Sequence, residues 1–281
     1  MTVDLHLHSS ASDGSDAPAD VIKGAAGAGL TTVSLTDHDN LDGIAEARLA
    51  ASEHGIDFIA GTELSVEWPH GSMHMLVYFL EPGAGPLQDR LSELQAGRHA
   101  RNIEVVGVLN GLGIDISYDE ILAEAGGRGV GRPHVAAVMV HKGYVATIQE
   151  AFDRYLGNGR PGYVERLRLD VDEAITLARA SAAVPVVAHP HTIGVSAEDY
   201  DAAFSRLSDA GLMGVEAFYP EYSPQTRAHL AALADERGMV ATGGSDYHGR
   251  FKPDIAIATG RGDLVVPDGV AENLRAAQAT L

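Results

Sequence analysis

The sequence predicts an α/β fold of parallel βα units with a helical segment inserted in its middle. Short β-branched, apolar runs alternate with helical runs over the first 80 residues and again from about residue 169, which is typical of parallel βα units. The stretch between these regions favours helix throughout. Ionisable side chains follow the ends of the expected strands, and parallel barrels collect such side chains at one rim.

The first third of the chain contains the first of these units. Gly29 is expected to end the first helix, and Pro69 and Gly71 indicate a hairpin turn at 69–72. The expected elements are strands at 3–8, 31–35, 58–63 and 73–80 and helices at 18–28 and 40–54.

Residues 81–86, Glu-Pro-Gly-Ala-Gly-Pro, interrupt this alternation and indicate a domain boundary. From there to about residue 168 the pattern is helical. Ser117 with Glu120, and Thr147 with Glu150, fit the capping box that begins a helix. A glycine-rich turn at 128–134 leads into a helix with proline in its first turn. We therefore expect a barrel domain of residues 1–82 and 169–281, and a helical insert of residues 83–168 that shapes the substrate pocket.

The βα alternation then returns and continues to the end of the chain. We see no internal repeat and no low-complexity tract in the sequence. The expected elements are helices at 170–182, 196–210, 223–237 and 268–280 and strands at 184–188, 215–219 and 239–242.

Composition narrows the classes of function. The 281 residues include no cysteine, so disulfides, thiolate metal sites and a cysteine nucleophile are excluded. The formal charge of −19 disfavours duplex DNA and anionic membranes as partners, because like charges repel at long range. No basic, apolar leader follows Met1, and no run approaches 18 apolar residues. We therefore expect a cytoplasmic protein.

Nine ionisable side chains lie at or near the expected strand ends. His6 and His8 are two residues apart, so on a strand both imidazoles point to the same side. Taken singly, each histidine is equally compatible with a buried, hydrogen-bonded core residue. Together, at one rim, they predict a metal centre. The nine are His6, His8, Asp13, His38, Glu63, His74, His189, Asp246 and His248.

Nine ligands exceed the number that one tetrahedral ion takes, so we expect two or three divalent or trivalent metal ions with Glu63 as a bridge. Nitrogen and oxygen ligands suit manganese, iron or zinc, with magnesium as an alternative. Ions ~3.5–4 Å apart activate water and stabilise the leaving oxygen of a phosphoester, which predicts metal-assisted hydrolysis. His191 is a candidate general acid or second-shell donor, or a residue without a role. A metal-bound water is the other candidate acid.

Arginines in the helical segment give it a basic character that opposes the acidic whole: Arg98, Arg101, Arg128, Arg132 and Arg160. We expect Arg132 and His134, helped by Arg101 with Asn102 or by Arg160, to hold a second phosphate through forked hydrogen bonds. Arg132 is the strongest candidate, since its neighbours Gly131 and Pro133 fix the backbone. A solvated helix face is the alternative interpretation of the same residues.

Five motifs, in this order, resemble the PHP (polymerase and histidinol phosphatase) superfamily: Asp-Leu-His-Leu-His at 4–8, Thr-Asp-His-Asp at 36–39, Gly-Thr-Glu at 61–63, Ala-His-Pro at 188–190 and Ser-Asp-Tyr-His at 245–248. The resemblance covers roughly residues 1–80 and 169–281, and it implies a distorted, TIM-like (β/α)7 barrel with a metal cluster. It implies one metal held by His6, His8, Glu63 and Asp246, a second by Asp13, His38 and His248, and a third by Glu63, His74 and His189. Asp13 stands where some relatives have a histidine, so the preferred metal of the second site stays open.

The insert, with Arg101-Asn102 and Gly-Arg-Pro-His at 131–134, is similar to a PHP branch of metal-dependent phosphoesterases. That branch contains phosphatases that remove the 3′-phosphate of nucleoside 3′,5′-bisphosphates and enzymes that trim RNA from its 5′ end. The resemblance thus implies a phosphomonoesterase that gives a nucleoside 5′-monophosphate such as AMP, through a hydroxide that bridges the metals. The alternatives are a 5′-to-3′ exoribonuclease acting on short RNA, a histidinol phosphatase and a non-catalytic PHP binding module.

Overall fold

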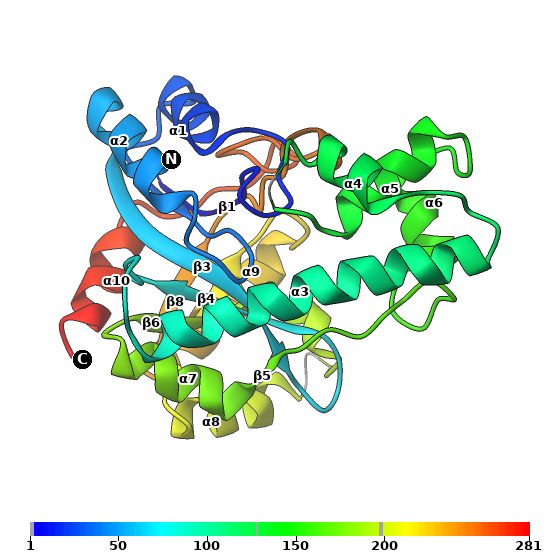
Figure 1. The fold of residues 1–281 in the computed structure, drawn as a ribbon. Helices are drawn as coiled ribbons and strands as arrows, with labels where there is room; N and C mark the ends of the chain where they lie inside the picture. The colour runs from blue at the N-terminus through cyan, green and yellow to red at the C-terminus, as the bar shows by residue number, and fades with distance from the viewer. Residues whose placement is uncertain (1–2, 128, 197–198) are drawn as a thin grey trace.

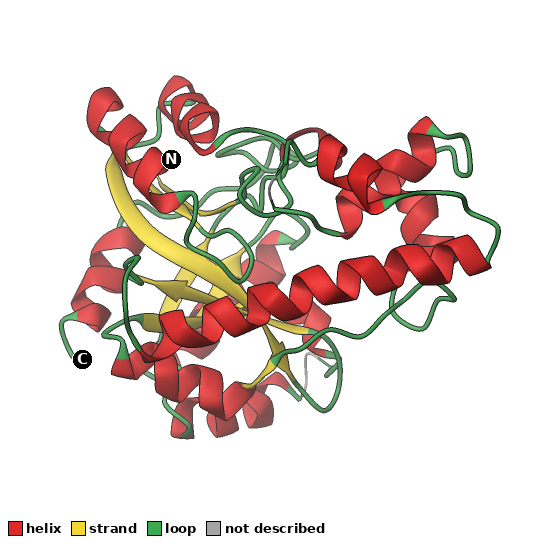
Figure 2. Ribbon diagram, viewed as in Figure 1, coloured by secondary structure: helices red, strands yellow, loops and turns green. Residues whose placement is uncertain are grey.

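The computed structural model describes residues 3–127, 129–196 and 199–281, so Met1 and Arg128 lie outside the described residues. A curved sheet forms the body of the molecule, and helices surround it (Figure 2). A second group of helices, α4 to α6, projects from one side of this body (Figure 1). The N- and C-terminal ends of the chain lie on the opposite side, away from that group.

The sheet runs in the order β1-β2-β3-β4-β6-β7-β8, with β5 beside β3. Its strands are β1 (Val3–Leu7), β2 (Thr32–Leu35), β3 (Asp57–Glu67), β4 (Met73–Tyr78), β5 (Leu169–Asp170), β6 (Val184–Ala188), β7 (Gly214–Phe218) and β8 (Val240–Gly243). A parallel bridge between Leu7 and Tyr247 brings the segment after β8 back to β1. The result is a nearly closed barrel, which confirms the predicted fold class.

The direction of β4 departs from the expectation of parallel units throughout the first 80 residues. This strand runs antiparallel to both of its neighbours, β3 and β6. The physical reason is the short link at 68–72, because a hairpin turn joins antiparallel strands whereas a parallel pair needs a long crossover. The reversal places the beginning of β4 at the rim where the parallel strands end. His74, the second residue of β4, therefore lies at that rim, opposite Ala188.

Helices cover the outside of the barrel at nearly the predicted positions: α1 (Pro18–Gly27), α2 (Ile44–His54), α7 (Val171–Ala180), α8 (Tyr200–Asp209), α9 (Pro224–Glu236) and α10 (Val270–Gln278). Helix α2 begins four residues later than expected. The side chain of Asn40 accepts a hydrogen bond from the Asp42 backbone and donates to the His38 carbonyl, which stabilises a turn in place of helix. Part of the expected start of α8, residues 197–198, lies outside the described residues.

The inserted segment is helical, as predicted, with α3 (Pro86–Gly111), α4 (Tyr118–Glu124), α5 (Arg132–His141), α6 (Ile148–Ala151) and the π-helix η1 (Phe152–Leu156). The capping box of Ser117 and Glu120 is confirmed. Thr147 also caps its helix, but the Glu150 carboxylate accepts from the Ala146 backbone instead of completing the box. These helices share a core of their own, around Val105 and Val135.

Helix α3 belongs to both parts of the molecule. Near its beginning, Leu87, Leu91 and Leu94 are buried in the largest core cluster of the barrel. Near its end, Val105 and Leu109 are buried in the core of the inserted helices. The division into residues 1–82 with 169–281 and residues 83–168 therefore remains a prediction, because one continuous helix spans both cores.

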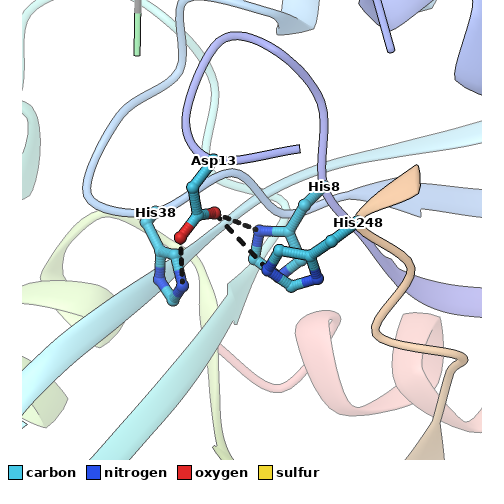
Figure 3. Close-up of side chains that lie close together, drawn as sticks. All are labelled: His8, Asp13, His38 and His248. Atoms are coloured by element: carbon cyan, nitrogen blue, oxygen red, sulfur yellow. Dashed lines mark ion pairs between the residues drawn. The ribbon is translucent and has the colours of Figure 1, made fainter. Parts of the chain in front are cut away.

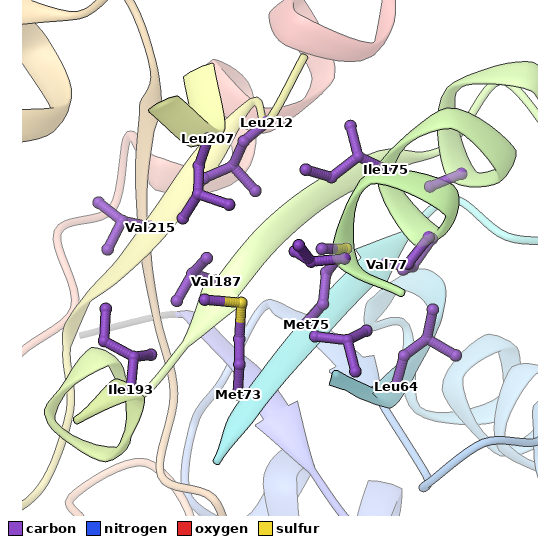
Figure 4. Packing of buried hydrophobic residues seen from close by; sticks show 14 of the residues in the cluster. Leu64, Met73, Met75, Val77, Ile175, Val187, Ile193, Leu207, Leu212 and Val215 are labelled. Carbon is purple, nitrogen blue, oxygen red and sulfur yellow. The ribbon is translucent and has the colours of Figure 1, made fainter. Parts of the chain in front are cut away.

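The largest core cluster fills the space between the sheet and the helices on one of its faces (Figure 4). Met73, Met75 and Val77 of β4 meet Ile175 of α7 and Leu207 of α8, all of them at most 1% exposed. Burial of each such side chain contributes about 1.5–3 kcal/mol to folding. Within the described ranges, no helix combines the length and the apolar character needed to span a bilayer.

Candidate metal centre

The structure brings the nine predicted ligands together at the rim where the parallel strands end. His6 lies near the end of β1 and His8 just after it, and both are fully buried. Their imidazoles converge as the strand alternation predicts, with the two Nε2 atoms 3.0 Å apart. Two ring nitrogens at this separation suit neighbouring ligands of one ion, since ligands ~2.1 Å from a metal are ~3.0 Å apart at an angle of ~90° and ~3.4 Å apart in a tetrahedron.

Glu63 lies at the middle of the cluster. Its Oε2 is 3.3 Å from His6 Nε2 and 3.1 Å from His8 Nε2. Its other oxygen, Oε1, is 2.8 Å from His74 Nδ1 and 2.9 Å from His189 Nε2. Each carboxylate oxygen thus faces a different pair of histidines, which is the arrangement of a bridging ligand.

Asp13 gathers a second group of imidazoles (Figure 3). Its Oδ1 lies 3.4 Å from His248 Nε2 and 3.8 Å from His8 Nδ1, and its Oδ2 lies 3.7 Å from His38 Nε2. The structure therefore adds His8 to the set of Asp13, His38 and His248 that the resemblance implies. His8 faces this group with Nδ1 and the group around Glu63 with Nε2.

Asp246 closes the cluster on the side of β8. Its Oδ1 lies 3.5 Å from His6 Nε2, 3.4 Å from His8 Nε2 and 3.3 Å from His248 Nδ1. Its backbone φ is +53°, in the left-handed region that non-glycine residues seldom adopt. The Asp246 N–H donates to the His6 carbonyl over 2.8 Å, so the strained residue is tied directly to β1.

These residues fit a metal cluster by their donor atoms and by their spacing. Three groups, around Asp13, His6 and His74, each have ligand atoms within 4.8 Å of one another. In the described part of the chain, His8 Nδ1 is buried without a hydrogen-bond partner, which is costly unless a cation or proton is bound there. All donors are imidazole nitrogens or carboxylate oxygens, which suit manganese, iron or zinc.

The carboxylates of the cluster are strongly disposed to stay ionised. Burial alone would raise the pKa of Glu63, but the interactions of its carboxylate with the imidazoles around it, those of His38 and His74 first and then that of His6, outweigh burial and hold this pKa well below its usual range. The pKa values of Asp13 and Asp246 are lowered in the same way. Three carboxylates that remain charged at neutral pH give the pocket the negative potential that attracts cations.

The histidines divide into two classes. Burial lowers the pKa of His38, His74 and His248, which therefore stay neutral. Burial also opposes the charged form of His8, but hydrogen bonds to Asp246 and Glu63 raise its pKa to about 9. The pKa of His6 is raised well above its ordinary value, since Glu216 and the cluster carboxylates outweigh burial. Because the two Nε2 atoms lie 3.0 Å apart, only one of them can carry a hydrogen, so without metal His6 and His8 share one proton at neutral pH.

Sequence reasoning missed the residue that orients two of the ligands. Glu216 of β7 is fully buried; its Oε1 lies 2.9 Å from His6 Nδ1, and its Oε2 accepts the His189 N–H over 2.7 Å. Carboxylates that contact the second nitrogen of a ligating histidine fix its tautomer and orientation. A signal was present, because Glu216 is the one acid inside an otherwise apolar strand, Gly-Val-Glu-Ala-Phe.

Two further buried acids hold the loops that carry the ligands. Asp37 accepts hydrogen bonds from the Ser9 backbone and the Ser9 and Ser12 hydroxyls. Asp4 accepts from the backbones of Ser245 and Ala258. Both acids lie inside the recognised motifs, at 4–8 and 36–39, so the motifs contain positioning groups as well as ligands.

Arginines from the helical insert reach the same rim. The Arg98 guanidinium lies 3.8 Å from Asp13 Oδ2 and 3.8 Å from Asp39 Oδ2. Arg166, which the sequence did not single out, lies 3.1 Å from the same oxygen of Asp39. Cations of the insert therefore contact one predicted metal ligand, Asp13, and the residue that follows another, Asp39 after His38.

Arg101 and Arg132 are cations without a carboxylate partner among the described residues. Burial, followed by repulsion from Arg98 and Arg132, lowers the pKa of Arg101 to about 9. Burial and Arg166 lower the pKa of Arg132 to about 10. Arg132 donates to the Leu156 carbonyl over 3.1 Å, and Arg101 Nε is buried with no partner in the described ranges. Arg98 and Arg166 thus lie near enough to Arg101 and Arg132 to lower their pKa values, and a group of guanidiniums of this kind is suited to bind an anion.

The other predicted substrate residues have more varied positions. Asn102 donates to the Val130 carbonyl over 2.9 Å. His134 caps its own helix by accepting the Gly131 N–H, and burial lowers its pKa to about 4, so it brings no positive charge. Arg160 is exposed in the turn after η1, and its part in phosphate binding stays a prediction. His191 lies at the rim, its side chain 40% exposed, with Nδ1 3.0 Å from the Tyr222 hydroxyl.

Two cavities adjoin the cluster on different sides. One, of about 230 Å³, is bounded by His38, Arg98 and Asn102. The other, of about 530 Å³, is bounded by Asp246 and Lys252 together with an apolar wall that includes Ile148, Phe251 and Ile255. The site is therefore open to solvent both toward the arginines and toward the segment after β8.

Comparison with known proteins agrees with this geometry. The model of the PHP domain family matches residues 4–157. The chain is 31% identical to a 3′,5′-nucleoside bisphosphate phosphatase of Chromobacterium violaceum, over 88% of this chain and 87% of the relative. It is 32% identical to a 5′-3′ exoribonuclease of Haemophilus influenzae, over 87% and 89% of the two chains. A solved metal-dependent phosphoesterase of Bifidobacterium adolescentis superimposes with a TM-score of 0.86 at 28% identity, over 99% of this chain and 96% of that one.

Proposed function

Because the chain belongs to the PHP domain family and is a metal-dependent phosphoesterase, we propose that it removes the 3′-phosphate of nucleoside 3′,5′-bisphosphates. The product is a nucleoside 5′-monophosphate. The observation that carries this proposal is a pair of arginines without carboxylate partners among the described residues, the buried Arg101 and the half-buried Arg132, next to the predicted metal ligands. A substrate with two phosphates can place one phosphate at the metal centre and the other at the arginines. A relative described as a 3′,5′-nucleoside bisphosphate phosphatase supports the choice.

Each part of the site has a role in this proposal. Bound metal ions supply an activated water and neutralise the charge on the phosphoryl oxygens. Glu63, Asp13 and Asp246 hold these ions together with the six histidines. The arginines bind the phosphate that is not cleaved, since guanidinium groups match phosphate oxygens in pairs. His191, at the rim, is our candidate to protonate the leaving 3′-oxygen.

The charge distribution favours a small anion over a long one. The net charge of −19 opposes the approach of a polyanion at distances shorter than the screening length of ~8 Å at physiological salt. The cations that oppose this charge at the site are largely buried: Arg98 and Arg101 are 9% and 6% exposed. A nucleotide that enters the pocket reaches them, whereas a long nucleic acid also meets the acidic exterior.

One observation favours a second candidate function, a 5′-to-3′ exoribonuclease acting on short RNA. The cavity of about 530 Å³ beside Asp246 is large enough for an organic ligand, and it does not border the arginines of α3. A further nucleotide attached to the reacting phosphate would find room there. A relative described as a 5′-3′ exoribonuclease supports this candidate. The ratio of turnover on a bisphosphate to turnover on a tetranucleotide separates the two functions.

The primary test is phosphate release from a panel of phosphoesters by the metal-loaded protein. We expect the highest kcat/KM on a nucleoside 3′,5′-bisphosphate. In Arg132→Ala, loss of a hydrogen bond to a charged group costs about 1.5–3 kcal/mol, or roughly 10- to 150-fold in KM, on this substrate. On a nucleoside 3′-monophosphate the KM should change little.

Arg154→Ala is the matched control, because Arg154 is an exposed arginine of the same segment that pairs with Glu150. It should behave as wild type on both substrates. Equal losses for Arg132→Ala on the bisphosphate and the monophosphate would contradict the assigned role of Arg132. A panel in which histidinol phosphate is the best substrate, or in which nothing is hydrolysed, would refute the proposed function itself.

A further inference from the structure

Lys252 contacts the cluster from a segment that none of the recognised motifs includes. It follows the short 3-10 helix η3 (Gly249–Phe251). Its Nζ lies 2.6 Å from Oδ2 of Asp246, and the Tyr219 hydroxyl donates to the same oxygen over 2.8 Å. We propose that Lys252 is a positioning residue that fixes the Asp246 carboxylate for metal binding. The proposal rests on the proposed role of Asp246 as a metal ligand.

The two donors divide the roles of the carboxylate oxygens. Oδ2 is occupied by an ammonium and a hydroxyl, whereas Oδ1 faces three ring nitrogens of His6, His8 and His248 at 3.3–3.5 Å. A carboxylate held in this way offers one oxygen to a cation. A free carboxylate rotates, and it can chelate a single ion with both oxygens. Lys252 thus selects one of the binding modes that an aspartate can adopt.

The backbone of Asp246 explains why such a clamp is needed. A non-glycine residue in the left-handed region costs of order 1–3 kcal/mol and persists only where its surroundings hold it. The backbone of Asp246 is held at two points, by the His6 carbonyl and by the ring of His248, which lies 2.9 Å from the Asp246 carbonyl oxygen. Neither contact restrains the side-chain torsions. Lys252 and Tyr219 supply that restraint from two other elements.

An ordinary surface ion pair is the alternative explanation for this contact. The Lys252 side chain is 39% exposed and borders the cavity of about 530 Å³, and exposed pairs contribute only about 0–1 kcal/mol. Asp246, however, has a side chain that is 6% exposed and belongs to the cluster. An ammonium beside a cation site also repels the cation, so its presence there is unfavourable unless orientation outweighs the repulsion.

The test measures Mn²⁺ binding to the full-length, chelator-treated protein by titration calorimetry, and it does not depend on turnover. Loss of a group that orients a metal ligand costs 10–100-fold in metal affinity, so we expect at least one Mn²⁺ to bind Lys252→Met about 10-fold more weakly than wild type. In Lys252→Arg, which keeps the positive charge, affinity should return to within about threefold of wild type. Melting of the metal-free variants serves as the check on folding.

Lys142→Met is the matched control, since Lys142 forms a 2.8 Å pair with Glu120 on the surface of the insert. It should bind Mn²⁺ as wild type does. Wild-type affinity in Lys252→Met overturns the proposal, and so does an Arg variant as weak as the Met variant. Absence of Mn²⁺ binding by the wild-type protein would overturn the metal site itself. Binding by wild type with no phosphoester turnover would instead refute the proposed substrate and leave the role of Lys252 standing.

Discussion

Metal loading of this protein is expected to release protons, and the number follows from the two classes of histidine. A metal ligand must offer a deprotonated nitrogen. His38, His74 and His248 already meet this condition, because burial lowers their pKa values. His6 and His8 do not, since neighbouring carboxylates raise their pKa values, that of His8 to about 9. Addition of Mn²⁺ to the metal-free protein therefore displaces the proton that His6 and His8 share between their Nε2 atoms.

The size of the effect depends on pH. With a pKa of about 9, His8 is ~97% protonated at pH 7.5 and ~24% protonated at pH 9.5. The pair should release about one proton at pH 7.5, and a bound water that ionises adds one more. The share of the pair falls by about 0.7 between the two pH values. Each displaced proton changes the apparent dissociation constant by roughly tenfold per pH unit, so loss of the shared proton should raise Mn²⁺ affinity by up to about 10-fold from pH 7 to pH 8.

Calorimetric titration in pairs of buffers that differ in ionisation enthalpy measures this proton count directly. The same titrations at pH 7.5 and at pH 9.5, without oxygen, follow its decline. A count close to zero at pH 7.5 would refute the protonated state of His6 and His8. A count that stays constant between the two pH values would refute the raised pKa of His8 and attribute the protons to water alone.

Two further predictions concern the same cluster. Glu216 contacts both His6 and His189, and Glu216→Gln keeps its shape but removes its charge, so Mn²⁺ should bind this variant about 10–100-fold more weakly. The control Glu236→Gln, at an exposed position of α9, should bind Mn²⁺ as wild type does. Equal Mn²⁺ affinity in the two variants would contradict the role of Glu216. The metal-free protein should melt at its highest temperature near pH 6.5, the ordinary pKa of histidine. Below this pH the unfolded chain takes up protons that His38, His74 and His248 refuse in the folded state. Above it the stability contributed by His6 and His8 is lost progressively until the pH passes about 9. A melting temperature that still rises from pH 8 to pH 10 would contradict this assignment.

Features with a local signal were predictable from the sequence. The strand Val184–Ala188 has the predicted bounds, and Ser117 caps α4 as its spacing to Glu120 indicates. The grouping of the nine predicted ligands could be inferred from the sequence, because the carboxyl ends of parallel strands meet at one rim. The direction of β4 has no such signal in the strand itself. It depends on the short link at 68–72, because a hairpin turn of that length joins antiparallel strands.

Two of the residues that the sequence did not single out share a different property. Lys252 and Arg166 are charged residues in irregular segments, where charge is ordinary and no periodicity marks a role. The role of each is suggested by one tertiary ion pair, that of Lys252 with Asp246 and that of Arg166 with Asp39. His134 is the opposite case. The motif predicts that it binds phosphate, whereas in the structure its Nδ1 accepts a hydrogen bond from the Gly131 backbone. Such assignments require the partner to be known, and a sequence pattern does not supply it.

The proposed selection for a second phosphate has a structural basis in the continuity of α3. Leu94 packs in the core of the barrel, and Arg98 and Arg101 follow within two turns of the same helix. An α-helix rises 1.5 Å per residue and is stiff over this length, so the arginines are fixed relative to the strands that carry the predicted metal ligands. Asp39 strengthens the link, since its carboxylate contacts Arg98 and Arg166 while the adjacent His38 faces the cluster. A substrate whose two phosphates match this fixed separation binds without reorganisation of the insert, and a substrate with one phosphate leaves buried cations uncompensated. The preference we propose for bisphosphates is therefore a property of the scaffold as much as of any single arginine.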